Sequence, residues 1–159
     1  MPRLPNREPS ITEIMQSLRR IFKKIQDYSH EVFNKFGITG PQLWTLKTIY
    51  QSDGLPIGEL SERMYLHPST ISGVVNRLEK KGYVLRDRGE TDRRVVNVRL
   101  TQRGRSLARK TPNPVQGKMI YGLKRLKRED LDRILGSVQT LVQIMEAQRV
   151  RVTFFFDEE

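Results

Sequence analysis

Apolar residues recur every three or four positions through most of the chain, the spacing expected for one face of an α-helix. The first of these stripes begins after Ser10, and Glu13 lies three residues further on, which is the pattern of a capping box. Gly37 supplies a helix stop. We therefore expect a long amphipathic helix over 10–36, capped by Ser10 and preceded by a flexible arm.

Shorter stretches of the same period predict a group of helices in the middle of the chain. Thr39 is a typical N-cap for a second helix, and "IGELSERMY" predicts a third. A fourth helix is expected over 68–81, with His67 as its cap, Pro68 in its first turn and Gly82 as its stop. The positions of this fourth helix expected to face the interior are Ile71, Val75 and Leu78.

After the fourth helix the pattern changes to the alternation typical of strands. "YVLRDR" and "VVNVRLT" predict a hairpin around the turn "GETDRR". Thr101 opens another helix, which the prolines of 111–114 interrupt. Further helices are expected over 115–125 and 128–148, and we expect the tail 152–159 to fray rather than to pack on a partner subunit. The fold class predicted is mainly α, with a winged helix-turn-helix lobe and terminal helices.

The distribution of charge along the chain indicates what kind of partner the protein binds. The chain has 29 Lys and Arg against 18 Asp and Glu, a net charge of +11. Residues 74–110 alone hold 12 basic and four acidic residues. Turns and strand-like alternation in this segment are not features of a basic membrane-surface helix, so we expect nucleic acid rather than lipid as the partner.

The chemistry of the side chains favours binding over catalysis. The chain has no cysteine, which excludes disulfides and thiolate catalysis, and neither His30 nor His67 has the spacing of a metal ligand. No phosphate-binding glycine loop or nucleophile–base pair is present in the sequence. We expect no enzyme activity, no metal and no cofactor. With no apolar run long enough for a signal peptide or a membrane span, we expect a cytoplasmic protein that does not use the membrane.

The segment over about 55–105 carries a family resemblance. Its motifs "PSTIS", "RLEKKGYV" and "DRRVVNVRLTQRG" resemble those of the MarR family of winged helix-turn-helix transcriptional regulators. The resemblance implies a homodimer whose terminal helices interlock and whose two winged lobes read palindromic double-stranded DNA. The terminal apolar stripes are also more than one small lobe can cover, which favours dimerisation independently.

The expected organisation follows from the resemblance and the predicted elements. The divisions are an N-terminal arm over 1–9, a dimerisation helix over 10–36, a winged helix-turn-helix DNA-binding domain over 37–110, C-terminal dimerisation helices over 111–150 and a tail over 151–159. We expect a repressor released by a small molecule. The alternative is a winged-helix architectural or RNA-binding module without a dedicated operator.

The fourth helix carries the residues expected to read DNA, because hydroxyl, amide and guanidinium groups suit base edges and phosphates. The candidates on this helix are Ser69, Thr70, Ser72, Asn76 and Arg77, and Lys80 near its end is expected at a phosphate or in solvent. Gly73 lies where the family tends to carry a larger and often basic side chain. Other basic residues, expected to contact phosphates or to be solvated, are Lys81, Arg86, Arg88 and Arg99.

An acidic residue interrupts the basic hairpin tip. Asp92 can stabilise the turn through its own backbone, or it can pair with a neighbouring guanidinium and fix its direction. In the family the matching aspartate orients the second arginine, which enters the minor groove. The resemblance therefore assigns this role to Arg94 and leaves Arg93 to a phosphate or to solvent.

A cluster of aromatic residues raises the question of an effector. The residues concerned are His30, Phe33, Phe36 and Trp44. Ordinary core packing explains most aromatic stripes at helical spacing. In many MarR relatives, however, a small aromatic or anionic ligand lies in this region, so an effector pocket is kept as a hypothesis.

Overall fold

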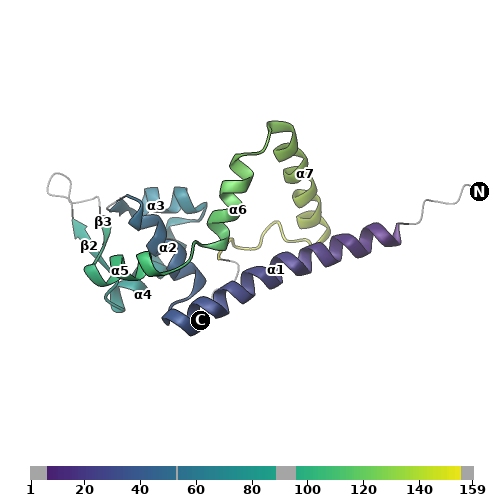
Figure 1. The fold of residues 1–159 in the computed structure, drawn as a ribbon. Coiled ribbons are helices and arrows are strands. Elements are labelled where there is room, and N and C mark those ends of the chain that lie inside the picture. Colours follow the sequence, from purple (N-terminus) through teal and green to yellow (C-terminus); the bar gives the residue numbers. More distant parts are fainter. Residues whose placement is uncertain (1–6, 53, 89–95, 155–159) are drawn as a thin grey trace, which may run out of the picture.

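The chain folds into helices and one small sheet, as the computed structural model shows for residues 7–52, 54–88 and 96–154 (Figure 1). In chain order the elements are α1 (Glu8–Phe36), α2 (Gly40–Tyr50), β1 (Leu55–Pro56), α3 (Ile57–Met64), α4 (Pro68–Lys80), β2 (Val84–Arg88), β3 (Val96–Leu100), α5 (Gln102–Lys110), α6 (Val115–Lys124) and α7 (Arg128–Ile144). The predicted fold class is confirmed. We call the part from α2 to α5 the winged lobe, and α1, α6 and α7 the arm helices.

The start of α1 differs from the prediction. The helix begins at Glu8, its N-cap position is Arg7, and no side chain caps it. Pro9 suits the first turn because its missing N–H is not needed there, so the helix extends past Ser10 and the predicted capping box is wrong.

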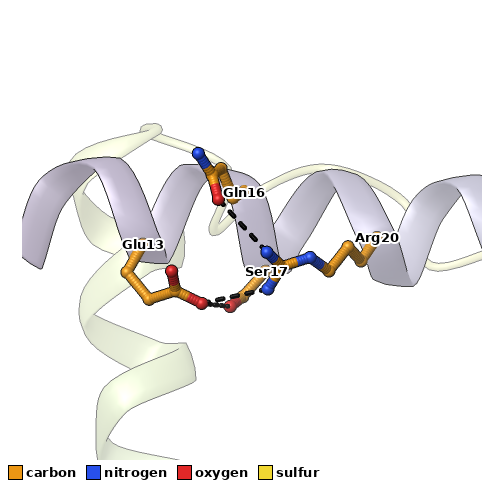
Figure 2. A network of polar contacts seen from close by, with 4 residues as sticks. All are labelled: Glu13, Gln16, Ser17 and Arg20. Carbon is orange, nitrogen blue, oxygen red and sulfur yellow. Dashed lines mark hydrogen bonds and ion pairs between the residues drawn. The ribbon is translucent and has the colours of Figure 1, made fainter.

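Glu13 serves α1 in another way. Its Oε1 accepts a hydrogen bond from Arg20 Nη1 at 3.0 Å and from Ser17 Oγ at 3.4 Å, and Arg20 Nη2 donates to Gln16 Oε1 at 3.1 Å (Figure 2). These side chains are four or seven positions apart, so they share one face of the helix. Glu13 thus joins two turns of α1 instead of closing its first one.

Three predicted N-caps are confirmed in the winged lobe, at the starts of α2, α4 and α5. Thr39 caps α2 in a complete capping box with Gln42. His67 caps α4, and Thr101 caps α5. Gly37 also ends α1 as predicted, with φ at 66°, a left-handed conformation that glycine adopts without strain.

The sheet has three antiparallel strands in the order β1-β3-β2. The predicted hairpin is confirmed in β2 and β3, whose pairs run from Val84 with Leu100 to Arg88 with Val96. The prediction missed β1, in which Leu55 pairs with Val98. Two residues are too few to show an alternation, and their partner lies far along the chain.

The C-terminal helices follow the predicted order with one shorter element. The prolines of 111–114 separate α5 from α6 as expected. The last helix ends at Ile144 rather than at 148, because Glu146 adopts a left-handed conformation with φ at 53°. No glycine marks this stop. In Figure 1 the winged lobe lies at the C-terminal end of α1, while α6 and α7 rise from the middle of that helix and meet at their far ends.

The core lies in the winged lobe and at the end of α1 that meets it. The largest fully buried side chains are Val32, Ile38, Leu43, Thr45, Leu46, Ile49, Leu60, Met64, Ile71, Val75, Leu78 and Val98. Within α1 the buried residues start at Ile25, so the N-terminal half of this helix contributes nothing to the core.

The C-terminal segment joins this core, contrary to the expected fraying. After α7 the chain runs back towards the winged lobe (Figure 1). Phe154 is 5% exposed and belongs to the core cluster. Its ring meets that of Trp44 edge-on, with 6.0 Å between centroids. The prediction of a frayed tail is therefore wrong for Phe154.

Candidate nucleic-acid interface

The buried apolar side chains of α4 fix the rotation of this helix about its own axis. Ile71, Val75 and Leu78 are each 0% exposed. At the start of the helix, His67 Nδ1 accepts a hydrogen bond from the backbone N–H of Ser69 at 3.3 Å. Because both the buried side and the cap are fixed, the same polar residues always face solvent.

Most of the α4 residues predicted to contact DNA lie on this outward side. The exposed ones are Ser69, Asn76, Arg77 and Lys80. Ser72 is half-buried. Thr70 differs from the prediction, because its hydroxyl oxygen is enclosed and has no hydrogen-bond partner among the described residues. The polar side of α4 is therefore narrower than the sequence indicated.

Arg77 lies back along α4. Its Nε donates to the carbonyl oxygen of Gly73 at 3.4 Å, and a Cβ on Gly73 would lie 4.0 Å from Arg77 Nη2. The guanidinium thus covers the surface at Gly73, where the family resemblance implies a larger and often basic side chain. Arg77 therefore places a positive charge over Gly73.

An ion-pair cluster joins the wing to α4. Arg86 of β2 donates through Nη1 to Glu79 Oε2 at 2.7 Å and through Nη2 to Asn76 Oδ1 at 2.5 Å. Both partners lie on α4, so Arg86 fixes the wing against the helix and orients the Asn76 amide. The prediction had assigned Arg86 to phosphates or solvent. Its partners could not be inferred from sequence spacing, because Arg86 lies on β2 and both partners lie on α4.

Two other basic residues also have partners within the chain. Lys81 Nζ donates to the carbonyl oxygen of Gly37 at 2.9 Å and to Gln42 Oε1 at 3.1 Å. Arg99 Nε lies 3.6 Å from Asp87 Oδ2, and both of these side chains are about half exposed. Lys81 therefore anchors the end of α4 to the α1–α2 junction, a structural role that its assignment to phosphate or solvent had missed.

The base of the wing is fixed by a close approach of backbone. Thr101 Oγ1 donates to the carbonyl oxygen of Gly82 at 2.8 Å and accepts from the backbone N–H of Gly104 at 3.1 Å. A Cβ on Gly104 would lie 1.9 Å from the carbonyl oxygen of Tyr83. Only glycine fits there, and the contact ties α5 to the turn between α4 and β2.

The predicted tip contacts lie beyond this base. Arg88 closes β2 and its backbone pairs with Val96 of β3. Asp92, Arg93 and Arg94 lie in 89–95, outside the described residues. Their roles remain predictions.

A cleft lies between the winged lobe and the arm helices. It measures about 510 Å³ and is lined by Trp44, Met64, Tyr65, Leu66, Gln116, Met119, Ile120, Leu123, Lys124, Leu131, Val152, Thr153 and Phe154. Of the four aromatic-cluster residues suggested as a pocket, only Trp44 lines this cleft. Phe36 packs on the core, whereas His30 and Phe33 are exposed on α1. Gln116 is 3% exposed, and its Oε1 has no hydrogen-bond partner among the described residues.

Two kinds of feature are missing from the parts of the chain that the structure describes. No helix there combines the length and apolar character needed to cross a membrane. Those residues also include no group of three or more His, Asp or Glu side chains arranged to share a metal ion.

Comparison with known proteins agrees with this arrangement. The sequence profile of the MarR family matches residues 38–96, from just before α2 to the first residue of β3. The organic hydroperoxide resistance transcriptional regulator of Bacillus subtilis (strain 168) is 30% identical over 114 residues, covering 72% of this chain and 76% of that protein. The chain belongs to the MarR family. The resemblance predicted from residues 55–105 is confirmed.

Other MarR-like proteins match parts of the chain. The HTH-type transcriptional repressor MdtR of Bacillus subtilis (strain 168) is 35% identical over 94 residues, which cover 59% of this chain and 61% of the repressor. The matched region thus spans less than two thirds of that relative. Among solved structures, a MepR-like protein complexed with pseudoligands is 26% identical with a TM-score of 0.58, over 85% of this chain and 95% of that one.

Proposed function

We propose that this MarR-family chain is a homodimeric transcriptional repressor that binds a palindromic DNA operator. The observation that carries the proposal is the fixed rotation of α4, whose inner residues are fully buried while its polar side faces solvent beside a wing. A helix in this position can enter the major groove. The excess of basic residues over 74–110 supplies the attraction to phosphates. The relative MdtR is named as a repressor.

Within this proposal the contacts divide by chemistry. Ser69, Ser72, Asn76 and Arg77 face the major groove, and Lys80 contacts phosphates. At the wing, Arg88 also contacts phosphates. Thr70 is proposed as a reader only where binding exposes its hydroxyl, because that oxygen is enclosed in the free chain.

At the hairpin tip, Asp92 orients Arg94 towards the minor groove and Arg93 remains at a phosphate. A narrow minor groove attracts arginine, and a guanidinium that is already held extended loses less entropy on entry. We expect Arg94→Ala to weaken operator binding more than Arg93→Ala, and Asp92→Ala to weaken it although the protein becomes more basic. Equilibrium titrations check this order. Binding by Asp92→Ala as tight as that of the wild type contradicts the orienting role.

Dimerisation follows from the arm helices. The large exposed apolar residues of α1 and α7 include Ile11, Ile14, Met15, Ile21, Phe22, Ile134, Leu135, Val138 and Val142. Exposed large apolar residues that recur along one helix are typical of an interaction site. The length and position of the arm helices support a second copy as the partner, which makes 10–36 and 111–150 the dimerisation region and 37–110 the DNA-binding domain.

An effector is proposed at the cleft that Trp44 lines. Its walls are mostly apolar, with the buried Gln116 amide as a polar group inside and Lys124 among the lining residues. Such a site suits a small aromatic compound that carries a hydrogen-bond donor or an anionic group. Because the cleft joins the winged lobe to the arm helices, a ligand there can favour a lobe spacing that does not match the operator.

The test of the proposed function is a selection from genomic DNA. Fragments that the purified protein retains are sequenced, and we expect a shared palindrome upstream of a small set of genes. Retention without any shared sequence would instead support an architectural or RNA-binding module. Retention of no DNA at all would contradict the proposed function.

A further inference from the structure

Phe154 holds the C-terminal segment on the winged lobe as a single anchor. It is 5% exposed, whereas the nearby Val150 and Val152 are 68% and 69% exposed. The ring of Phe154 lies edge-on to Trp44, at an interplanar angle of 80°. Aromatic pairs favour this geometry. One apolar side chain therefore fixes the position of residues 151–154.

The anchor is also one wall of the cleft. Val152, Thr153 and Phe154 all line it, together with residues of α6. Gln116 of α6 also lines it and has a buried amide oxygen without a hydrogen-bond donor among the described residues. An unpaired buried acceptor costs free energy, so a ligand that brings a donor is favoured at this point. A ligand that enters the cleft therefore contacts the C-terminal segment.

The same segment reaches the start of α4. Arg151 Nη2 donates to Ser69 Oγ at 3.0 Å. The Ser69 hydroxyl also lies 2.8 Å from His67 Nδ1, which accepts from the backbone N–H of Ser69. With Nδ1 as an acceptor, the hydroxyl donates to His67 and accepts from Arg151. The group then presented to solvent at this end of α4 is a guanidinium with N–H donors to spare.

We propose that residues 151–154 form a clip in which Phe154 is the anchor and Arg151 is a phosphate contact that the anchor delivers to the start of α4. A ring-bearing ligand with a hydrogen-bond donor takes the place of Phe154 in the cleft, pairs with Gln116 and withdraws Arg151 from the DNA. The clip thereby couples the cleft to the recognition helix through the chain's own C-terminal segment. This inference rests on the proposed function, because it needs α4 to face DNA.

The chain offers a direct probe of the anchor, since Trp44 is its only tryptophan. Phe154→Ala should expose the indole to water, shift its emission to longer wavelength and increase quenching by acrylamide. Val150→Ala is the matched control, because Val150 is exposed and does not line the cleft. Identical emission and quenching in wild type and Phe154→Ala would overturn the anchor.

DNA binding tests the delivered contact. Titrations at several salt concentrations compare wild type, Arg151→Ala and Arg149→Ala, in which Arg149 carries the same charge two residues earlier and makes no hydrogen bond to Ser69. Arg151→Ala should weaken binding about tenfold and lower the slope of log K against log salt by about 0.9 for each chain. Phe154→Ala should weaken binding similarly, and the double variant should be no weaker than Arg151→Ala alone. Equal slopes for Arg151→Ala and Arg149→Ala would overturn the clip.

The displacement step is tested with p-cresol, which has an apolar ring and a phenolic donor. We expect Phe154→Ala to bind it at least several-fold more tightly than wild type, because no side chain must leave the cleft. In the wild type it should weaken DNA binding, and in Arg151→Ala it should weaken DNA binding less, because the Arg151 contact is already absent. Equal or absent binding of p-cresol by wild type and Phe154→Ala overturns the displacement.

These measurements separate the two proposals. A wild type without preference for any palindrome contradicts the proposed operator function, while the salt slopes on unrelated duplex DNA still test Arg151. A wild type that prefers a palindrome, together with an Arg151→Ala variant indistinguishable from Arg149→Ala, leaves the proposed function intact and rejects the clip.

Discussion

The winged lobe and the arm helices have apolar stripes of the same period, yet only the stripes of the lobe and of the C-terminal half of α1 are covered. On α4 the inward residues Ile71, Val75 and Leu78 are 0% exposed. On α7 no residue is buried, and Leu135 and Val138 are about half exposed. Helical periodicity thus indicates which side of a helix is apolar but not what covers it. The lobe completes its core within one chain, whereas the arms need a second surface.

The largest difference is expected from the same truncation made in the two regions. Leu46→Ala, at a fully buried position of α2, should lower the free energy of unfolding by about 2–5 kcal/mol through lost burial and the cavity left behind. Leu135→Ala should instead weaken dimerisation and leave the lobe folded. Urea titrations followed by Trp44 fluorescence, with particle mass by light scattering, check both. Equal destabilisation of the lobe by the two changes would remove the contrast.

A glycine pair sharpens the comparison within the lobe. Gly104→Ala should cost about 1–3 kcal/mol, because its Cβ would overlap the Tyr83 carbonyl oxygen. Gly58→Ala is the control, since a Cβ there meets nothing within 4 Å. That control should be neutral or slightly stabilising in a helix. Urea unfolding of both variants measures the difference, and a tolerated Gly104→Ala would mean that the junction is looser than described.

The ion pairs of the wing give a smaller effect. Arg86→Ala should lower the free energy of unfolding by about 1 kcal/mol, because its pair with Glu79 is partly shielded and also holds Asn76. Arg99→Ala removes an exposed pair and should cost less than about 0.5 kcal/mol. Denaturant titrations compare the two. A cost for Arg99→Ala as large as that for Arg86→Ala would contradict the ranking by burial.

A pH-dependent effect is expected at Tyr28, where α1 enters the core. Its hydroxyl is buried without a partner among the described residues, and burial, together with Glu31, raises its pKa above the ordinary 10.0. The folded state therefore holds this proton more tightly, so its contribution to stability is intact below pH 10 and is lost as pH rises above it. Tyr28→Phe should stabilise by about 1 kcal/mol at pH 8, because an unpaired buried hydroxyl is removed.

The same variant should lose less stability than wild type between pH 8 and pH 11. Unfolding free energies measured at both pH values test the effect, with Tyr121→Phe as the control because Tyr121 is 62% exposed. Equal losses in wild type and Tyr28→Phe would show that this phenol does not titrate differently in the folded protein.

The features predicted correctly from sequence are those set by neighbouring residues. Thr39, His67 and Thr101 each cap the helix that follows them, since a cap depends on a side chain and the next few backbone N–H groups. The inward residues of α4 are also predicted correctly, because Ile71, Val75 and Leu78 recur at helical spacing within a short stretch of sequence.

The features missed from sequence depend on residues far apart in the chain. β1 has two residues and pairs with β3 across 43 positions, so no local pattern marks it. The sequence places Arg86 at a phosphate or in solvent, because its partners Glu79 and Asn76 lie on another element and leave no local pattern. Phe154 had been expected to fray, since nothing in "VTFFFDEE" shows that the Trp44 ring lies within reach.

The most direct test of the account is the ratio of two affinities at physiological salt. The protein is titrated into its selected palindrome and into a scrambled duplex of equal length and composition. A regulator whose fixed α4 reads bases should prefer the palindrome by about 10³ or more. A ratio near one would mean that the basic face binds only the backbone, and would contradict the central claim.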